Sequence, residues 1–440
     1  MLIQFSVSNF RTFKEKATLN LIASNYDKER EPENIIENSK NNLRVLKSAV
    51  IYGANASGKS KFLDALMFMK RFIITSSKET QKGEEIPVES FKLNVETKDK
   101  SSEFEVLFTI NNVIYRYGFE VDQTKVVSEW LFYKPKTKEI ELFYRDHQKF
   151  ETHPRNFQKG ATLVKEKLIR NNALLLSVAG QFNDTISTNI IDWFYDLRTI
   201  SGLREDGYRG YTMGRTKDPG HKQKILDLLK AADLGIQDIK LETLDLDKLP
   251  KDMPKDIKDD IIKQSKENNS VFASDILTTH KIFNSKHQHV DNIDFSLEDD
   301  ESWGTKKFFA LTGPILDVLE NGRILVVDEL DSKLHPNLVC KIVSLFNSQE
   351  HNPKNAQLIF NTHDTNLLSS GLFRRDQIWF SEKDKFGEAK LYSLADFKSD
   401  GVRKTDPFEE NYIRGKYGAV PYLGLFDNLI SNKIIQHNEK

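Results

Sequence analysis

The sequence GANASGKS at residues 53–60 matches the phosphate-binding loop pattern G-x-x-x-x-G-K-[ST]. A short apolar run at residues 49–52 precedes it, and an apolar helical pattern that starts at Phe62 follows it. This order predicts a strand, a loop and a helix, which is the context that such a loop needs. The alternative is a glycine-rich turn without a ligand, and the flanking elements disfavour it. We therefore expect the chain to bind a nucleoside triphosphate.

The residue types of this loop suit a triphosphate and its metal ion. Glycines let the backbone wrap around the phosphates, so that successive N–H groups point inward. Lys59 is expected to reach the β- and γ-phosphates, and the Ser60 hydroxyl is expected to bind Mg²⁺. The loop residues expected to contact the nucleotide are Gly53, Asn55, Ser57, Gly58, Lys59 and Ser60.

A second apolar run, at residues 324–327, ends in two carboxylates, Asp328 and Glu329. In enzymes with this loop, an Asp at the end of such a strand (the Walker B strand) holds Mg²⁺ directly or through water. The adjacent Glu can polarise the attacking water. Lys59 and Asp328 lie 269 positions apart, so a large insertion must separate the two motifs. A buried strand that ends in acids without a function is the alternative.

Two further stretches are candidates for nucleotide contact. Ser302 and Gly304 open a helical pattern, and a helix N-terminus with these residues can bind an anion, although an ordinary helix cap also explains them. The apolar run at residues 357–360 leads to His363. A residue at the C-terminal end of a strand lies on the ligand side of an open α/β sheet. A core or capping histidine is the alternative.

The N-terminal third of the chain is predicted to be rich in strands. Residues 3–21 indicate a β-hairpin, and the polar residues 25–42 indicate an exposed loop. Alternating runs from residue 91 to residue 144 indicate an antiparallel meander, with Asn111 and Asn112 in a tight turn. Helical patterns follow at residues 160–235, and residues 245–268 are expected to be a polar surface segment.

Charge and composition narrow the function classes. A formal net charge of −1 gives no global electrostatic case for nucleic acid or an anionic membrane, although a local basic patch stays open. The single cysteine, Cys340, excludes an intramolecular disulfide and a cysteine-based metal site, and it fits a reducing compartment. No apolar run approaches the length that spans a bilayer. We expect a cytoplasmic protein without a membrane partner.

Three weaker features leave alternatives open. The basic residues of segment 204–224 could contact DNA phosphates or belong to a solvated loop. His280, His287 and His289 could bind a metal ion, but exposed polar histidines are the better interpretation because no further ligand accompanies them. Residues 415–421 are either a docking surface or a turn packed on the core.

The order of the motifs resembles the ABC-type ATPases of the SMC, RecF and OLD kind. The residues that carry this resemblance are Asn9, Phe10, Arg11, the loop 53–60, Ser302, Gly304, Asp328, Glu329, Asp331 and His363. More narrowly, the chain resembles the AbiLi/RloA type of abortive-infection ATPase. The stretches that suggest this type are residues 301–305, 328–336, 376–380 and 415–421.

The resemblance implies an α/β fold, with an ABC-type P-loop ATPase head that has a mixed sheet, an antiparallel meander and a helical lobe insertion. It divides the chain into three parts. Residues 1–155 would form an N-terminal ATPase lobe with the phosphate-binding loop and antiparallel strands. Residues 156–300 would form a mostly helical insertion lobe. Residues 301–440 would hold the signature helix, the Walker B strand, His363 and a C-terminal segment.

In the family that the chain resembles, two heads sandwich ATP and Mg²⁺ between them. Ser302 and Gly304 would then contact the γ-phosphate bound by the partner head. The chain departs from the common signature, because Trp303 stands where a glycine is usual. Asp331 would help to couple the two nucleotide sites.

The resemblance also assigns roles close to the reacting phosphate. Glu329 would activate the attacking water, and His363 would sense that water or the γ-phosphate. Arg11 resembles a nucleotide-contacting arginine of SMC-like heads, and Gln181 would be the Q-loop residue that reports on Mg²⁺. Ordinary surface positions are the alternative for Arg11 and Gln181.

These features together predict an ATP-hydrolysing protein that works as a homodimer or a higher homo-oligomer. The insertion has no long heptad run, so a coiled-coil arm is not expected. Only 60 residues follow Phe380, which is short for the TOPRIM nuclease of OLD proteins. We therefore expect the sensor or regulator subunit of an anti-phage abortive-infection system, gating a separately encoded toxin or nuclease-type effector. The alternatives are a RecF-like DNA-repair ATPase, with DNA as partner, and an ATP-stabilised oligomeric scaffold with slow turnover.

Overall fold

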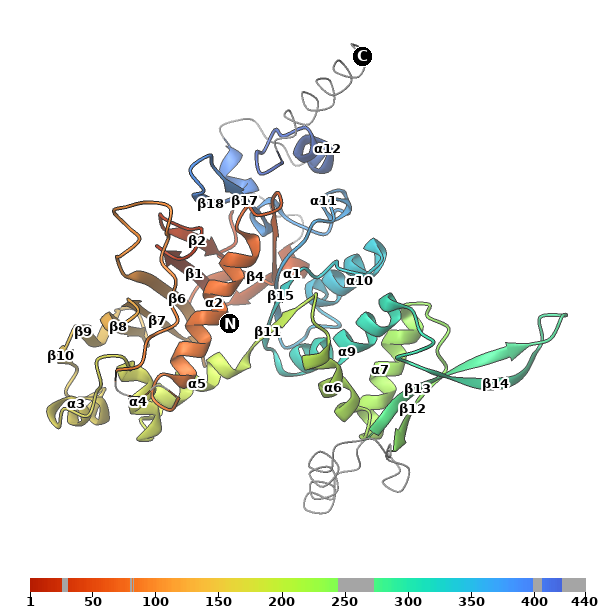
Figure 1. The fold of residues 1–440 in the computed structure, drawn as a ribbon, viewed down its shortest axis with the longest axis horizontal. Coiled ribbons are helices and arrows are strands. Elements are labelled where there is room, and N and C mark those ends of the chain that lie inside the picture. The colour runs from red at the N-terminus through yellow and green to blue at the C-terminus, as the bar shows by residue number, and fades with distance from the viewer. Residues whose placement is uncertain (26–30, 80, 82, 244–272, 399–405, 422–440) are drawn as a thin grey trace, which may run out of the picture. The chain divides into compact units, whose positions relative to one another are not determined.

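The computed structural model describes residues 1–25, 31–79, 81, 83–243, 273–398 and 406–421 (Figure 1). The chain forms two compact units. Unit 1 consists of residues 1–201, 321–331 and 340–440, and unit 2 consists of residues 202–320 and 332–339. This division does not test the three lobes expected from the sequence, which stay a prediction.

A six-stranded mixed sheet forms the centre of unit 1, in the order β11-β15-β16-β5-β17-β18. Its strands are β5 (Ser48–Tyr52), β11 (Leu197–Ser201), β15 (Ile324–Asp328), β16 (Gln357–Asn361), β17 (Ile378–Lys383) and β18 (Ala389–Ser393). The first five strands in the sheet order are parallel, and β18 runs antiparallel to β17. Every residue of β5 and β16 is buried, as central parallel strands with two covered faces require. The sheet is the mixed sheet that the sequence predicts.

The second sheet of unit 1 has seven antiparallel strands in the order β10-β9-β8-β7-β6-β1-β2. The strands are β1 (Leu2–Ser8), β2 (Ala17–Asn20), β6 (Ser102–Ile110), β7 (Val113–Val121), β8 (Val126–Lys134), β9 (Ile140–Asp146) and β10 (Lys149–Thr152). Asn111 and Asn112 form the turn between β6 and β7 with φ of 51° and 64°, as a type I′ hairpin turn needs. The expected meander is confirmed, except that the alternating run at residues 91–95 lies in turns.

Helix α2 (Lys59–Thr75) begins at the end of the phosphate-binding loop and contacts both sheets, through β1 and β15 (Figure 1). Aromatic side chains hold it against the antiparallel sheet. The Phe62 ring meets the Phe5 ring edge-on at 5.4 Å, and the Phe68 ring lies 5.0 Å from the Phe104 ring. Such pairs stabilise a core beyond the apolar area that they bury. The loop therefore leads into a helix whose body is fixed by packing.

Three helices of unit 1 follow the meander: α3 (Gln158–Lys165), α4 (Leu175–Gln181) and α5 (Thr185–Asp196). The buried pair Glu129 and Arg145 ties α4 to the sheet. The Glu129 carboxylate accepts hydrogen bonds from the backbone N–H groups of Leu175 and Leu176, at 2.7 and 3.0 Å. The Arg145 guanidinium lies 3.6 Å from that carboxylate, and both side chains are fully buried.

Residues 31–42, described within the segment 25–42 that was expected to be an exposed loop, contain regular structure, so the prediction is wrong for these residues. They hold α1 (Glu31–Asn34) and β3 (Ile35–Asn38), and β3 pairs with β4 (Leu43–Leu46). Ile35 and Ile36 are buried. Two adjacent isoleucines among polar residues give neither a helical nor a strand period, and the composition hides them.

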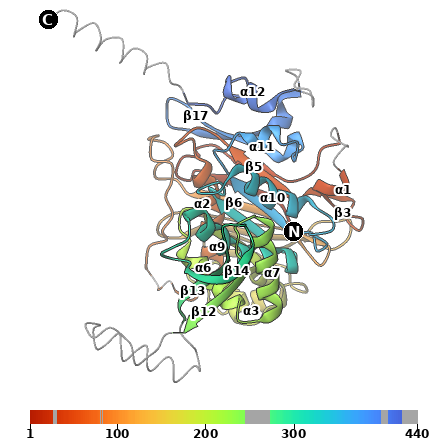
Figure 2. The same cartoon turned by 90° about the vertical axis from the view of Figure 1, so that its right-hand side faces the viewer.

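Unit 2 contains helices and a three-stranded antiparallel sheet, drawn in green to teal in Figure 2. Its elements are α6 (Asp206–Arg215), α7 (Pro219–Ala231), β12 (Asp238–Thr243), β13 (Ala273–Phe283), β14 (His289–Ser296) and α9 (Trp303–Asn321, which ends in unit 1). Helices α6 and α9 approach closely, because the Thr212 hydroxyl donates to the Ala310 carbonyl at 2.6 Å and accepts from Gly313 N–H at 3.2 Å. Unit 2 therefore combines helices with an antiparallel sheet, and the mostly helical lobe expected at residues 156–300 stays a prediction. The polar segment expected at 245–268 lies outside the described residues.

The C-terminal third completes unit 1. Helix α10 (Pro336–Asn347) begins in unit 2 and ends in unit 1. The other short elements are α11 (Asn366–Ser369), η2 (Arg375–Gln377), η3 (Leu394–Lys398) and α12 (Phe408–Ile413). Among the residues that the structure describes, no helix is long and apolar enough to cross a membrane.

Candidate nucleotide site

Three of the expected motifs meet at one edge of the six-stranded sheet. Strands β15, β16 and β5 are adjacent and parallel, with Val327 paired to Phe360 and Asn361 paired to Ile51. Their carboxyl ends therefore lie together, and ligands bind at this edge in open α/β sheets. The phosphate-binding loop follows β5, the Walker B carboxylates end β15, and His363 follows β16.

The phosphate-binding loop has a backbone that only small residues allow. A Cβ atom on Gly53 would lie 2.3 Å from the Ser381 carbonyl oxygen and 2.5 Å from the Ser57 hydroxyl. Gly58 has φ of 110°, in the region that favours glycine, and it precedes the first residue of α2. None of the described side chains caps this helix N-terminus. Its first N–H groups and the positive end of its dipole therefore suit an anion.

Lys59 lies inside the loop that it is expected to serve. Its Nζ donates hydrogen bonds to the carbonyl oxygens of Gly53 and Ala54, at 2.8 and 3.1 Å. Burial lowers the pKa of Lys59 to about 8, although the carboxylates of Glu329, Asp328 and Asp331 partly oppose this shift. The side chain is thus held in the loop by two neutral acceptors that phosphate oxygens can replace.

Two buried polar groups beside the loop lack hydrogen-bond partners in the described part of the chain and indicate which kind of ligand the site suits. The Ser57 hydroxyl is buried and has no hydrogen-bond partner among the described residues. The same is true of one Asp331 carboxylate oxygen, Oδ1. Buried polar atoms are normally satisfied, so such atoms near a glycine-rich loop fit a ligand with many oxygens and a bound cation. The donor set thus fits Mg²⁺ and a nucleoside triphosphate.

Asn361, which the sequence analysis did not single out, links the Asp328 carboxylate to the backbone of Glu329. Its Nδ2 donates to Asp328 Oδ1 at 2.5 Å, and its Oδ1 accepts from the Glu329 backbone N–H at 2.5 Å. Glu329 has φ of 57°, a left-handed conformation that is uncommon for this residue type. A polar residue directly after the apolar run at residues 358–360 was the signal that could have found Asn361.

The backbone at His363 is held by Asp331, a residue that the sequence analysis named. Its backbone N–H donates to Asp331 Oδ2 at 3.2 Å. The pKa of His363 is lowered, first by partial burial and then by the nearby charge of Lys59. The imidazole is therefore largely neutral at pH 7, where an unperturbed histidine is already mostly deprotonated.

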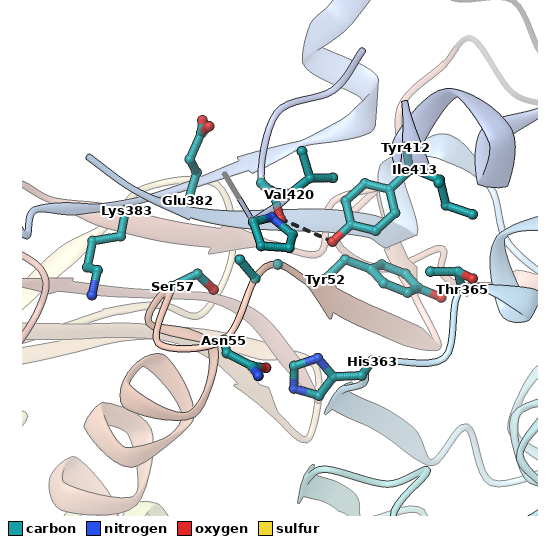
Figure 3. Close-up of a pocket in the computed structure, with 14 residues that line it drawn as sticks. Tyr52, Asn55, Ser57, His363, Thr365, Glu382, Lys383, Tyr412, Ile413 and Val420 are labelled. Atoms are coloured by element: carbon teal, nitrogen blue, oxygen red, sulfur yellow. Dashed lines mark hydrogen bonds between the residues drawn. The ribbon is translucent and has the colours of Figure 1, made fainter. Parts of the chain in front are cut away.

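A cavity of about 850 Å³ opens beside the loop (Figure 3). Asn55 and Ser57 from the loop and His363 from the end of β16 line its lower part as drawn. Tyr412 of α12 and Val420 line the opposite part. The predicted turn at residues 415–421 thus lies at the candidate site, with Tyr417 and Ala419 buried, so it is packed on the core.

Arg11 precedes Thr12, whose hydroxyl lies against Gly58 of the phosphate-binding loop, whereas Gln181 lies elsewhere in unit 1. The Arg11 guanidinium pairs with the carboxylates of Asp64 and Glu89. Gln181 is exposed at the end of α4, whose first residues contact Ser76 and Ser77 just after α2. That end of α2 is about 25 Å from Lys59, at the usual rise per residue. Both assignments stay predictions, and the placement of Gln181 does not favour its assignment.

Ser302 and Gly304 belong to unit 2. The Ser302 hydroxyl accepts from Thr305 N–H at 3.1 Å, which is the ordinary helix cap considered as the alternative. Trp303 is 61% exposed, and the ammonium groups of Lys306 and Lys333 lie 4.8 and 4.4 Å from its ring centre. The expected contact of Ser302 and Gly304 with a partner's nucleotide stays a prediction.

The basic segment of unit 2 is paired internally. Arg209 pairs with Glu298, Lys222 with Asp238 at 2.7 Å, and Arg215 and Lys224 with Glu320 at 2.6 and 2.7 Å. The histidines show the same pattern: His280 contacts Glu301 at 2.7 Å, and His289 contacts Asn292 at 3.1 Å. Across the described ranges no group of three potential ligands could hold a metal ion.

Comparisons with known proteins agree with this geometry. Residues 48–369 match the model of the family described as "AAA domain, putative AbiEii toxin, Type IV TA system". The chain belongs to this family. The matched region of this AAA-domain chain begins with β5 and ends with α11, so it includes the phosphate-binding loop, the Walker B carboxylates and His363. No curated protein sequence matches significantly.

Among solved structures, the chain is similar to the SMC head domain from Thermotoga maritima. The two are 12% identical over 89% of this chain and 98% of that one, with a TM-score of 0.40. A similarity at this level carries no statement about individual residues or ligands, so the site rests on the geometry and the family match.

Proposed function

We propose that this chain binds ATP with Mg²⁺ and hydrolyses it at the carboxyl edge of the six-stranded sheet. The observation that carries the proposal is the meeting of three motifs at that edge: the loop with Lys59, the pair Asp328 and Glu329, and His363. The family match over residues 48–369 supports it, because that family is described as an AAA domain.

Each group has a chemical task in this proposal. The loop N–H groups and Lys59 bind the phosphates, and Ser60 and Asp328 hold the metal ion. Mg²⁺, when bound, supplies positive charge to the phosphate oxygens. Glu329 accepts the proton of the attacking water, a task worth about 10²- to 10⁴-fold in rate. Asn361 holds the Asp328 carboxylate and the Glu329 backbone through its side-chain amide, so that the end of β15 is ordered before the reaction.

We further propose that ATP closes an interface between two copies of the chain, with Ser302 and Gly304 completing the partner's site. The protein would be an AbiLi/RloA-type regulator in anti-phage defence that gates a separate effector. The family description, which names a putative toxin of a toxin–antitoxin system, supports this setting. The internal ion pairs of Arg209, Arg215 and Lys222 leave the DNA-repair alternative without a supporting observation.

The experiment that tests the proposal is ATP turnover per chain as a function of protein concentration. Turnover that rises with concentration supports sites completed by a second chain. A mixture of Lys59→Met and Ser302→Arg chains should recover part of the activity that each lacks alone, since each mixed dimer keeps one intact composite site.

The defence role has its own test. Co-purification of an effector and increased phage sensitivity after deletion in the native host would support it. Deletion without any change in phage sensitivity, and with no effector recovered, would refute the regulatory role while leaving the ATPase proposal standing.

A further inference from the structure

The order of strands in the central sheet indicates the direction in which a bound nucleotide lies. The Walker B carboxylates follow β15 and His363 follows β16, and both strands lie on one side of β5. The metal ion and the γ-phosphate of the proposed ATP site therefore point to that side. The nucleoside end is expected to leave the phosphate-binding loop on the other side of β5, where β17 and β18 lie.

A hairpin on that other side ends at the same edge of the sheet. Strand β17 runs parallel to β5, so its carboxyl end lies at the edge that holds the loop, and the turn at residues 384–388 leads back into β18. The Ser381 hydroxyl donates to the Ser57 carbonyl oxygen at 2.9 Å. At the other strand, a Cβ atom on Gly58 would lie only 3.0 Å from the Ala389 Cβ. Both strands of the hairpin therefore touch the loop.

The tip of this hairpin exposes an aromatic ring. Phe386 is 67% exposed, and its ring centre lies 5.1 Å from the Lys385 ammonium. Leu93, which is 71% exposed, lies against the same tip, because a Cβ atom on Gly387 would clash with the Leu93 side chain. Two large apolar side chains from distant segments that meet at the surface beside a charged group indicate a binding surface more than one scattered exposed residue does.

The backbone that carries the ring is held in place. The Asp384 carboxylate accepts hydrogen bonds from the N–H groups of Phe386 and Glu388, at 2.9 and 3.0 Å. The Ala389 N–H donates to the Thr12 carbonyl oxygen at 2.8 Å, so the hairpin is also tied to the turn between β1 and β2. Little further ordering of this backbone is needed when a ligand stacks on the ring.

Phe386 lies within reach of a nucleotide on the loop. It is three residues from Ala389, which lies against Gly58, and three extended residues span at most about 10 Å. In a nucleoside triphosphate, the α-phosphate and the ribose separate the base from the β-phosphate. A base that leaves the loop toward β18 therefore meets the tip of the hairpin, and every nucleobase has a π-face that can stack on such a ring.

We propose that Phe386 is the base-stacking residue of the nucleotide site, with Leu93 packing beside the same base. This inference rests on the proposed ATP site. It names the ligand class that the site selects: a nucleotide with an aromatic base, in preference to a bare polyphosphate. The base is remote from the reacting phosphate, so loss of the ring should weaken binding and leave the chemical step unchanged.

The test compares two ligands that differ by the nucleoside. Calorimetric titration of the full-length chain measures the Kd for a non-hydrolysable ATP analogue and for inorganic tripolyphosphate, each with Mg²⁺. Phe386→Ala should raise the Kd for the ATP analogue about five- to tenfold, the low end of what stacking on an aromatic side chain gives, and leave that for tripolyphosphate unchanged. The kcat at saturating ATP should change by less than about twofold. Phe283→Ala is the matched control, because that ring is 55% exposed and lies in unit 2, and its loss should change neither Kd.

Phe386→Trp gives an independent measurement. It keeps an aromatic face, so its Kd for the ATP analogue should stay within about twofold of the wild-type value. Fluorescence of the added indole should be quenched by the ATP analogue and not by tripolyphosphate. An unchanged Kd for the ATP analogue in Phe386→Ala, or an equal loss for both ligands, overturns the base contact while the ATP site stands. Wild-type protein that binds neither ligand refutes the ATP site, and the base contact with it.

Discussion

The low pKa of Lys59 predicts that ATP binding weakens at alkaline pH. In the nucleotide-free protein, Nζ is buried against two carbonyl oxygens, and its pKa is about 8. Binding a triphosphate requires the ammonium form, so above pH 8 the lysine must take up a proton when the nucleotide binds. Each pH unit above the pKa then costs about 1.4 kcal/mol of binding free energy.

The magnitude follows from the fraction of protonated Lys59. The Kd for the nucleotide should be constant below about pH 7.5, about twice as high at pH 8, and roughly tenfold higher at pH 9. The slope lasts until the pKa of the nucleotide-bound state is reached, which the phosphates raise toward or above the ordinary value of about 10.4. Protons are therefore taken up on binding within this window and not below it.

The assay is a titration with a fluorescent ATP analogue and Mg²⁺ at a series of pH values from about 6.5 to 9.5, a range that spans the predicted midpoint. Lys59→Met is the control, since it should bind weakly and without this pH dependence. A wild-type Kd that stays flat up to pH 9 would refute the argument. So would the same slope in Lys59→Met, because another group would then carry the proton.

Three other outcomes follow from the structure. Glu329→Gln should keep ATP binding and lose roughly 10²- to 10⁴-fold in turnover, and wild-type turnover in this variant would remove Glu329 as the base. Arg145→Met should lower the free energy of unfolding by about 3–5 kcal/mol, because it leaves the buried Glu129 carboxylate without its cation. Urea denaturation measures this loss, and a loss below about 1 kcal/mol would contradict the prediction. Gly313→Ala should lower the free energy of unfolding by about 1–3 kcal/mol, and with it the melting temperature. The new Cβ would lie 2.3 Å from the Thr212 hydroxyl and 2.8 Å from the Thr212 Cα. An unchanged melting temperature would mean that α6 and α9 can move apart to make room for the methyl group.

The parts of the site that the sequence predicted share one property: each is a short pattern whose neighbours define its structure. The loop at residues 53–60 lies between a strand and a helix, and the Asp328–Glu329 pair ends an apolar run. Their meeting could be expected because parallel strands place their carboxyl ends together. The meander was predictable from its alternation and its Asn-Asn turn.

The parts that could not be predicted depend on which distant segments become neighbours. Asn361 matters because β16 lies beside β15, an order that no local pattern encodes. Tyr412 and Gly53 line the same cavity although more than half of the chain separates them, and only the fold brings them together. The same reason explains Arg11: its partner Asp64 is chosen by the packing of α2.

The packing of α2 between two sheets also has an entropic consequence. Aromatic contacts such as Phe62 on Phe5 and Phe68 on Phe104 immobilise the helix whose N-terminus would receive the phosphates. The conformational entropy of that anion cradle is therefore lost when the chain folds, and little more has to be lost when a nucleotide arrives. Affinity at such a site is governed by what the nucleotide displaces: the lysine contacts with Gly53 and Ala54, and the water that fills the cavity beside them.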